Sequence, residues 1–147
     1  MTLVEKIGED LKEAMKAKDG FRVSCLRMLK TSLKLKQVEK GHTLADEEAH
    51  SVIASLIRKG QEAALEFRKG NREDLALKEE REVKFLYTYL PQQMTPEEIE
   101  AALREVIQEL SAQGIKDLGR VMKAAMVRVG DQAQGKQVNE IARRLLS

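Results

Sequence analysis

The chain has 147 residues, of which 42% are hydrophobic and 34% are charged, and its formal net charge is +2. This length allows one medium-sized domain or two small ones, and the hydrophobic content is sufficient for a core, which excludes an intrinsically disordered chain. The small net charge excludes a polycation, so any affinity for nucleic acid has to come from local clusters of basic residues.

Four amphipathic helices are predicted over residues 3–90, where apolar residues recur every three or four positions. The four stripes are Leu3, Ile7, Leu11 and Met15; Val23, Leu26, Leu29 and Leu33; Val52, Ile53, Leu56, Ala63 and Phe67; and Leu75, Val83, Leu86 and Leu90. We expect the third helix to end at Gly70 and Asn71 to cap the fourth. No segment alternates apolar and polar residues as a half-buried strand does, so the predicted fold class is all-α.

Two prolines, Pro91 and Pro96, predict a domain boundary, because proline cannot continue a helix. Thr95 and Glu98 then form the pattern of a capping box that starts a new helix. We therefore expect an N-terminal helical bundle of about four helices over residues 1–91 and a smaller three-helix domain over residues 95–147. The predicted helices of the second domain are residues 96–113, 117–129 and 134–146.

Basic residues gather in two parts of the chain. Residues 22–40 contain six basic residues against one acid, and residues 116–147 contain seven against three. Such clusters can neutralise phosphates, and helix N-termini add to the attraction, although solvated faces of amphipathic helices also explain them. The candidate nucleic-acid-binding residues are Lys30, Lys34, Lys116, Arg120, Lys123, Lys136, Arg143 and Arg144.

Catalytic, metal and cofactor signatures are missing from the sequence. His42 and His50 are eight positions apart, too far for a metal pair on one helical face, and Cys25 is the only cysteine. The glycines do not form a phosphate-binding loop, and no motif pairs two carboxylates in a cleft. Gly8 and Gly60 lie inside predicted helices, where either a close helix contact or neutral drift explains them. We expect no catalytic residue, metal or cofactor, and no enzyme activity of the chain by itself.

The cellular location is predicted from the N-terminal segment and from the hydrophobic runs. Residues 1–7 include an acid and no uninterrupted apolar run, unlike a signal peptide. No segment approaches the roughly 20 apolar residues that a membrane span needs. We therefore expect a cytoplasmic protein without a membrane partner.

Several short motifs together resemble the GatB/YqeY family. They are Lys116–Met122 with Gly135–Asn139, Leu26–Lys30, Glu66-Phe67, Arg72–Leu75, and Tyr89-Leu90-Pro91 with Gln93. The resemblance implies an N-terminal helical bundle joined to a small helical domain like the tail of the B subunit of glutamine-dependent tRNA amidotransferase. In that enzyme the tail contributes to tRNA recognition, and its catalytic parts have no counterpart here. The chain departs from the family pattern at Lys123, where glycine is usual, and at residues 127–135, where a basic loop is usual.

Three functions follow as expectations. The first is a non-catalytic tRNA-associated binding module, whose partners would be tRNA, an amidotransferase or translation-related proteins. The second is an amidotransferase-like enzyme or subunit that transfers nitrogen from glutamine. The third is a protein–protein adaptor that uses the acidic fifth helix, whose acids are Glu97, Glu98, Glu100, Glu105 and Glu109.

Overall fold

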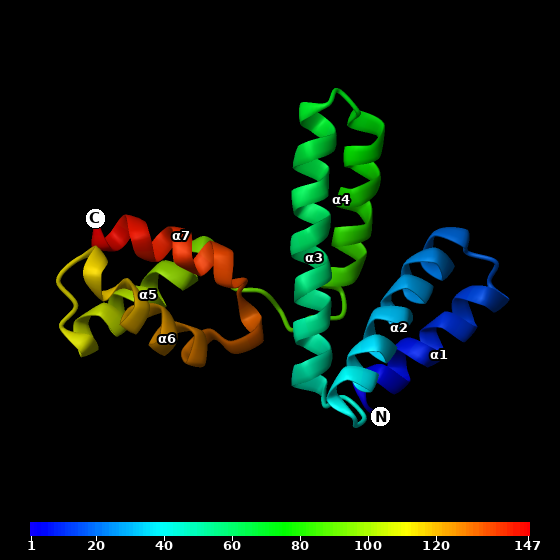
Figure 1. The fold of residues 1–147 in the computed structure, drawn as a ribbon, viewed down its shortest axis with the longest axis horizontal. Helices are drawn as coiled ribbons and strands as arrows, with labels where there is room; N and C mark the ends of the chain where they lie inside the picture. Colours follow the sequence, from blue (N-terminus) through cyan, green and yellow to red (C-terminus); the bar gives the residue numbers. More distant parts are fainter. The chain divides into compact units, whose positions relative to one another are not determined.

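The computed structural model describes all residues from Met1 to Ser147 and contains seven α-helices, two short 3-10 helices and no strand. The predicted all-α class is therefore confirmed. The helices form two compact units, Met1–Leu90 and Pro91–Ser147 (Figure 1). No helix combines the length and the hydrophobicity that crossing a bilayer requires.

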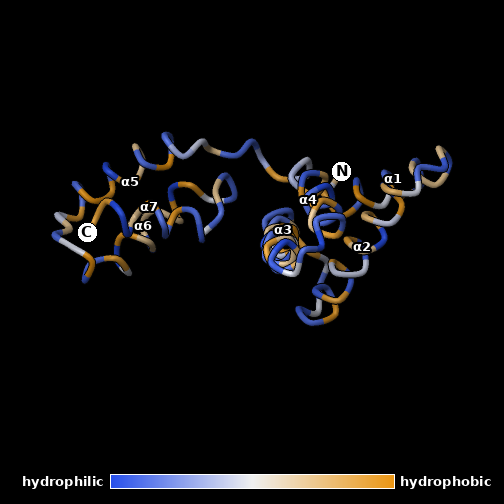
Figure 2. The backbone as a smooth tube through the Cα atoms, turned by 90° about the horizontal axis from the view of Figure 1, so that it is seen from above, coloured by the Kyte–Doolittle hydropathy of each residue, from blue (hydrophilic) through white to orange (hydrophobic).

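The N-terminal unit consists of two helical hairpins. Its helices are α1 (Leu3–Lys16), α2 (Gly20–Lys40), α3 (Asp46–Lys69) and α4 (Glu73–Tyr87). α1 and α2 form one hairpin, and α3 and α4 form a second hairpin that lies beside it (Figure 1). Hydrophobic and hydrophilic residues alternate along each helix at short intervals, which gives each helix an apolar side to bury (Figure 2).

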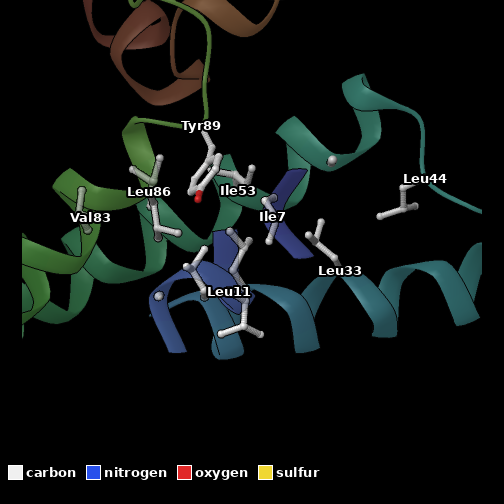
Figure 3. Close-up of a cluster of buried hydrophobic side chains, with 13 residues drawn as sticks. Ile7, Leu11, Leu33, Leu44, Ile53, Val83, Leu86 and Tyr89 are labelled. Atoms are coloured by element: carbon white, nitrogen blue, oxygen red, sulfur yellow. The ribbon is translucent and has the colours of Figure 1, made fainter. Parts of the chain in front are cut away.

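One hydrophobic core holds the two hairpins together. Ile7 from α1, Leu33 from α2, Ile53 from α3 and Leu86 from α4 are all buried in it (Figure 3). Aromatic contacts extend this core, because the ring of Phe85 meets two other rings edge to face. Those rings are Phe21, with centroids 5.9 Å apart, and Tyr89, with centroids 5.8 Å apart.

Glycine is required at only one of the two mid-helix positions. A Cβ atom on Gly60 in α3 would lie 2.6 Å from a methyl group of Val83 in α4, so glycine allows these helices their close approach. A Cβ atom on Gly8 in α1 would meet nothing within 4 Å. Close contact therefore explains Gly60, and packing does not explain Gly8.

The turn between α3 and α4 differs from its prediction. Asn71, expected as an N-cap, instead has a left-handed backbone with φ of 60°, whereas Gly70 has φ of −86°. Arg72 occupies the N-cap position of α4. Asparagine tolerates left-handed geometry better than most residues, so it takes the role that the sequence assigned to glycine.

The C-terminal unit is a compact group of three α-helices with short 3-10 turns. Its elements are α5 (Pro96–Leu110), η1 (Ile115–Asp117), α6 (Leu118–Val129), η2 (Gly130–Gln132) and α7 (Gly135–Leu146). The predicted capping box is present: Glu98 N–H donates to Thr95 Oγ1, and Thr95 N–H donates to a Glu98 carboxylate oxygen. Ile99, Leu103 and Val121 are fully buried in the separate core of this unit.

The segment that follows Pro91 belongs to the C-terminal unit. The side-chain amide of Gln93 donates to the carbonyl of Asp131 at 2.9 Å, and Met94 N–H donates to the carbonyl of Gln132 at 2.8 Å. These bonds tie the start of the unit to η2, so the chain is ordered before α5 begins.

Candidate functional site

The eight predicted nucleic-acid-binding residues are divided between the two units. Lys30 and Lys34 are exposed one turn apart on α2, and neither forms an ion pair. The other six lie in the C-terminal unit. Lys116, Arg120 and Lys123 follow one another at helical spacing from η1 into α6, whereas Lys136 stands at the start of α7.

Several of these cations already have partners. Arg120 pairs with Asp117 at 3.2 Å, Arg144 pairs with Glu100 at 3.3 Å, and Arg143 donates to the side chain of Asn139 at 2.9 Å. Lys116, Lys123 and Lys136 form no ion pair. The assignment of the eight residues as nucleic-acid contacts stays a prediction.

The acidic fifth helix does not present a free acidic surface. Arg128 of α6 reaches Glu105 at 3.2 Å and Glu109 at 2.8 Å. Glu100 pairs with Arg104 at 3.1 Å as well as with Arg144, and Glu98 is used in the capping box. Because four of the five acids are engaged within the unit and Glu97 alone has no partner, the electrostatics of this helix do not support the expected adaptor surface.

The N-terminal unit contains a groove near exposed apolar side chains. It consists of two adjoining hollows between α2 and the α3–α4 hairpin, which share Leu56 and Lys59. We call it the hairpin groove. The first hollow has a volume of about 230 Å³ and is lined by Met28, Leu56, Lys59, Gly60, Ala63, Glu79, Glu82, Val83 and Leu86. The second has a volume of about 320 Å³ and is lined by Ser32, Leu35, Lys36, Glu39, Ser51, Val52, Ser55, Leu56 and Lys59.

Two apolar side chains of α2 stay exposed at the hairpin groove. Met28 is 39% exposed and Leu35 is 67% exposed, although both line a hollow. They do not belong to the predicted stripe of α2, whose leucines are buried against α1 and α3. Apolar residues off the stripe were thus the only sequence signal for this site, and the sequence reasoning missed it.

The charges of the hairpin groove are unevenly distributed. In the second hollow Lys36 and Glu39 pair with each other at 3.3 Å. In the first hollow Glu79 and Glu82 are both half-buried, and neither forms an ion pair. Burial, followed by the charge of Glu79, raises the pKa of Glu82 above its usual value. The groove therefore has a mixed apolar and polar lining, with two glutamates that form no ion pair at its α4 end.

The single cysteine of the chain has no activated thiol. Cys25 is buried and lines neither hollow, and burial followed by the charge of Glu82 raises the pKa of its thiol to about 11. A thiol of that pKa is almost entirely protonated at neutral pH and is a poor nucleophile. No cluster of three or more His, Cys, Asp or Glu side chains could hold a metal ion.

Comparison with protein families identifies the relatives of the chain. The family model described as Yqey-like protein matches residues 4–146. The chain belongs to the YqeY-like protein family. The resemblance expected from the sequence motifs is thereby confirmed, including the relationship of the YqeY family to the tail of the amidotransferase B subunit.

Curated YqeY-like relatives are yeast proteins named altered inheritance of mitochondria protein 41, mitochondrial. The relative from Vanderwaltozyma polyspora is 33% identical over 105 residues, which cover 69% of this chain and 57% of the relative. The relative from Lachancea thermotolerans is 34% identical, covering 73% of this chain and 59% of the relative. That from Kluyveromyces lactis is 33% identical, covering 73% and 60%. The matches thus span less than two thirds of each relative.

These relatives correct two expectations. Their names refer to mitochondrial inheritance and mention neither tRNA nor amide transfer, so the expected tRNA-associated function and its amidotransferase alternative are contradicted. The same names contradict the expected cytoplasmic location, because the relatives are mitochondrial proteins. The expected function came from the resemblance to the tail of the amidotransferase subunit, whereas the expected location came from the N-terminal segment and the lack of a long apolar run.

Proposed function

We propose that the N-terminal unit of this YqeY-like protein is a docking module that binds an amphipathic helix of a partner protein in the hairpin groove. The observation that carries the proposal is the pair of exposed apolar side chains, Met28 and Leu35, at a groove whose lining includes other apolar residues, among them Leu56, Val83 and Leu86. Exposed apolar side chains that gather at a concave surface are typical of interaction sites.

The dimensions of the groove suit a helix. Its floor follows α3 from Ser51 to Ala63, and a helix rises 1.5 Å per residue, so the floor is about 18 Å long. That length corresponds to about three turns of a bound helix. The apolar positions Leu35, Val52, Leu56 and Val83 lie along it, and they could receive side chains spaced three or four residues apart.

The charge of the groove supports a polypeptide occupant. The two half-buried carboxylates at one end complement a basic or N-terminal helix segment, and serines at the other end offer hydrogen bonds to polar side chains. This surface differs from the acidic fifth helix in place and in chemistry.

The proposal is tested with a display library of amphipathic helical peptides selected against the full chain. Binding of the selected peptides is then measured by fluorescence anisotropy with two matched variants, Leu35→Lys in the groove and Leu77→Lys on α4. Leu77 is 56% exposed, comparable to Leu35, and lines neither hollow.

We expect Leu35→Lys to weaken binding about tenfold or more, because it places a charge in an apolar contact, and Leu77→Lys to leave it unchanged. Peptides that bind both variants as tightly as the unmodified protein would overturn the proposal. A selection that yields no helical binder would overturn it as well.

A further inference from the structure

We infer that the helix bound in the hairpin groove presents a lysine or arginine side chain to Glu79 and Glu82, an inference that rests on the proposed docking function. The two carboxylates are one turn apart on α4 and line the same hollow as Met28 and Leu86. The partner is thus an amphipathic helix whose apolar face carries one cationic side chain near the α4 end of the groove.

Two neighbouring acids of the same hairpin, Glu73 and Glu80, have partners within the chain. Glu80, adjacent to Glu79 in sequence, accepts two hydrogen bonds from Arg68, the shorter at 2.8 Å. Glu73 accepts two more from the same guanidinium, at 2.8 and 3.0 Å. Glu80 is therefore neutralised within the chain, whereas its neighbours Glu79 and Glu82, which line the groove, form no ion pair.

No nearby cation forms an ion pair with the groove carboxylates, and the charge of Lys78 lowers the pKa of Glu82 by less than burial raises it. Lys59 lies where the two hollows join, yet it forms no ion pair with Glu79 or Glu82. Arg81, which directly precedes Glu82 in α4, is held over the ring of Phe21, with its guanidinium carbon 3.7 Å from the ring centroid. Lys36 in the second hollow is occupied by Glu39.

Covering these carboxylates with a purely apolar helix would remove water from two acidic groups without replacing it. Burial of an unpaired carboxylate is strongly unfavourable, whereas a charge-assisted hydrogen bond from lysine or arginine compensates for the lost hydration. The burial that already raises the pKa of Glu82 indicates that its hydration is reduced before any partner binds. The pair therefore selects a cationic helix and rejects an apolar or acidic one.

The test uses peptides obtained by the selection described above and the full-length protein. Each lysine or arginine of a selected peptide is replaced in turn by glutamine, and affinity is measured for the unmodified protein and for the double variant Glu79→Gln, Glu82→Gln. A matched control is Glu62→Gln, which alters an exposed glutamate of α3 that lines neither hollow and forms no ion pair.

We expect one peptide cation whose replacement weakens binding about tenfold to the unmodified protein and to the control, but about twofold or less to the double variant. The coupling should shrink as salt is added. If every replacement has the same effect on both proteins, the inference is wrong while docking stands. If the peptides bind Leu35→Lys as tightly as the unmodified protein, the proposed docking function is wrong as well.

Discussion

The phenol of Tyr89 donates a 2.6 Å hydrogen bond to the carboxylate of Asp10, a residue 79 positions earlier in the chain. Tyr89 follows the end of α4 and is 8% exposed, while Asp10 lies in the middle of α1. The ammonium group of Lys6 lies 5.6 Å from the centroid of the same ring. This contact fastens the first helix to the end of the fourth, and the geometry of the hairpin groove depends on how the two hairpins are joined.

Replacement of Tyr89 by phenylalanine is predicted to destabilise the N-terminal unit by about 1.5 kcal/mol, because a hydrogen bond to a charged acceptor is lost in a half-buried setting. The measurement is urea unfolding followed by far-UV circular dichroism. Tyr87→Phe is the control, since the hydroxyl of Tyr87 only accepts a long 3.4 Å bond from the exposed Gln61. Equal decreases in the free energy of unfolding of the two variants would show that the bond to Asp10 does not stabilise the unit.

The two mid-helix glycines should respond in opposite directions to alanine. Gly60→Ala is predicted to cost about 1–3 kcal/mol, because its new methyl group would meet the stiff, buried Val83 side chain. Gly8→Ala is predicted to stabilise the unit by about 0.5–1 kcal/mol, because the site is open and alanine favours helix. The denaturant concentration at the unfolding midpoint is compared between each variant and the unmodified protein. A higher midpoint for Gly60→Ala would refute the packing argument.

Acid should weaken the tip of the α3–α4 hairpin through Arg68. Hydrogen bonds from Arg68 hold the pKa values of Glu73 and Glu80 below their usual value of 4.5. A folded-state pKa below the unfolded value means that the stabilisation is complete above about pH 4.5 and is lost as the pH falls through the lowered values. Protonation of Glu73 and Glu80 in acid therefore removes the stabilisation that their bonds to Arg68 provide.

Urea unfolding at neutral pH and near pH 3 measures this effect. Arg68→Gln should reduce the loss of stability on acidification, because the pKa values of both glutamates return toward 4.5. Arg58→Gln, which alters an exposed arginine of α3 without an ion pair, should retain the full loss. An unchanged acid response in Arg68→Gln would contradict the assignment.

Cys25 should react slowly with alkylating reagents in the folded protein. Its thiol pKa of about 11 leaves about a thousandth of it as thiolate at pH 8, and the side chain is buried. Alkylation by iodoacetamide, followed by mass spectrometry, should accelerate strongly in denaturant. A Ser24→Cys, Cys25→Ala variant moves the thiol to the exposed neighbouring position and should react quickly without denaturant. Rapid alkylation of native Cys25 would refute the burial argument.

Local sequence patterns predicted much of the secondary structure. The capping box at Thr95 involves residues three positions apart, so its chemistry is visible in the sequence before the chain folds. The stripe that includes Leu26, Leu29 and Leu33 predicted the buried side of α2 for the same reason. At the turn after α3 the local signal misled, because both Gly70 and Asn71 can take up left-handed geometry and only the folded turn selects Asn71.

The candidate site could not be predicted in this way. Leu35 is an ordinary apolar residue in the sequence, and only the docking of one hairpin against the other places it at the edge of a groove. Likewise, adjacent acids in α4 look equivalent, yet the structure pairs Glu80 with Arg68 and leaves Glu79 facing the groove.

The amino-acid sequence by itself determined the all-α class, the helical stripes and the family, because these depend on spacing within a few turns and on short motifs. The tertiary structure alone decided which glycine is needed, which charges remain unpaired and where apolar side chains stay exposed. Those properties depend on contacts between helices that are distant in sequence, such as the bond from Tyr89 to Asp10. No local pattern encodes such contacts, since each is set by the packing of whole helices against one another.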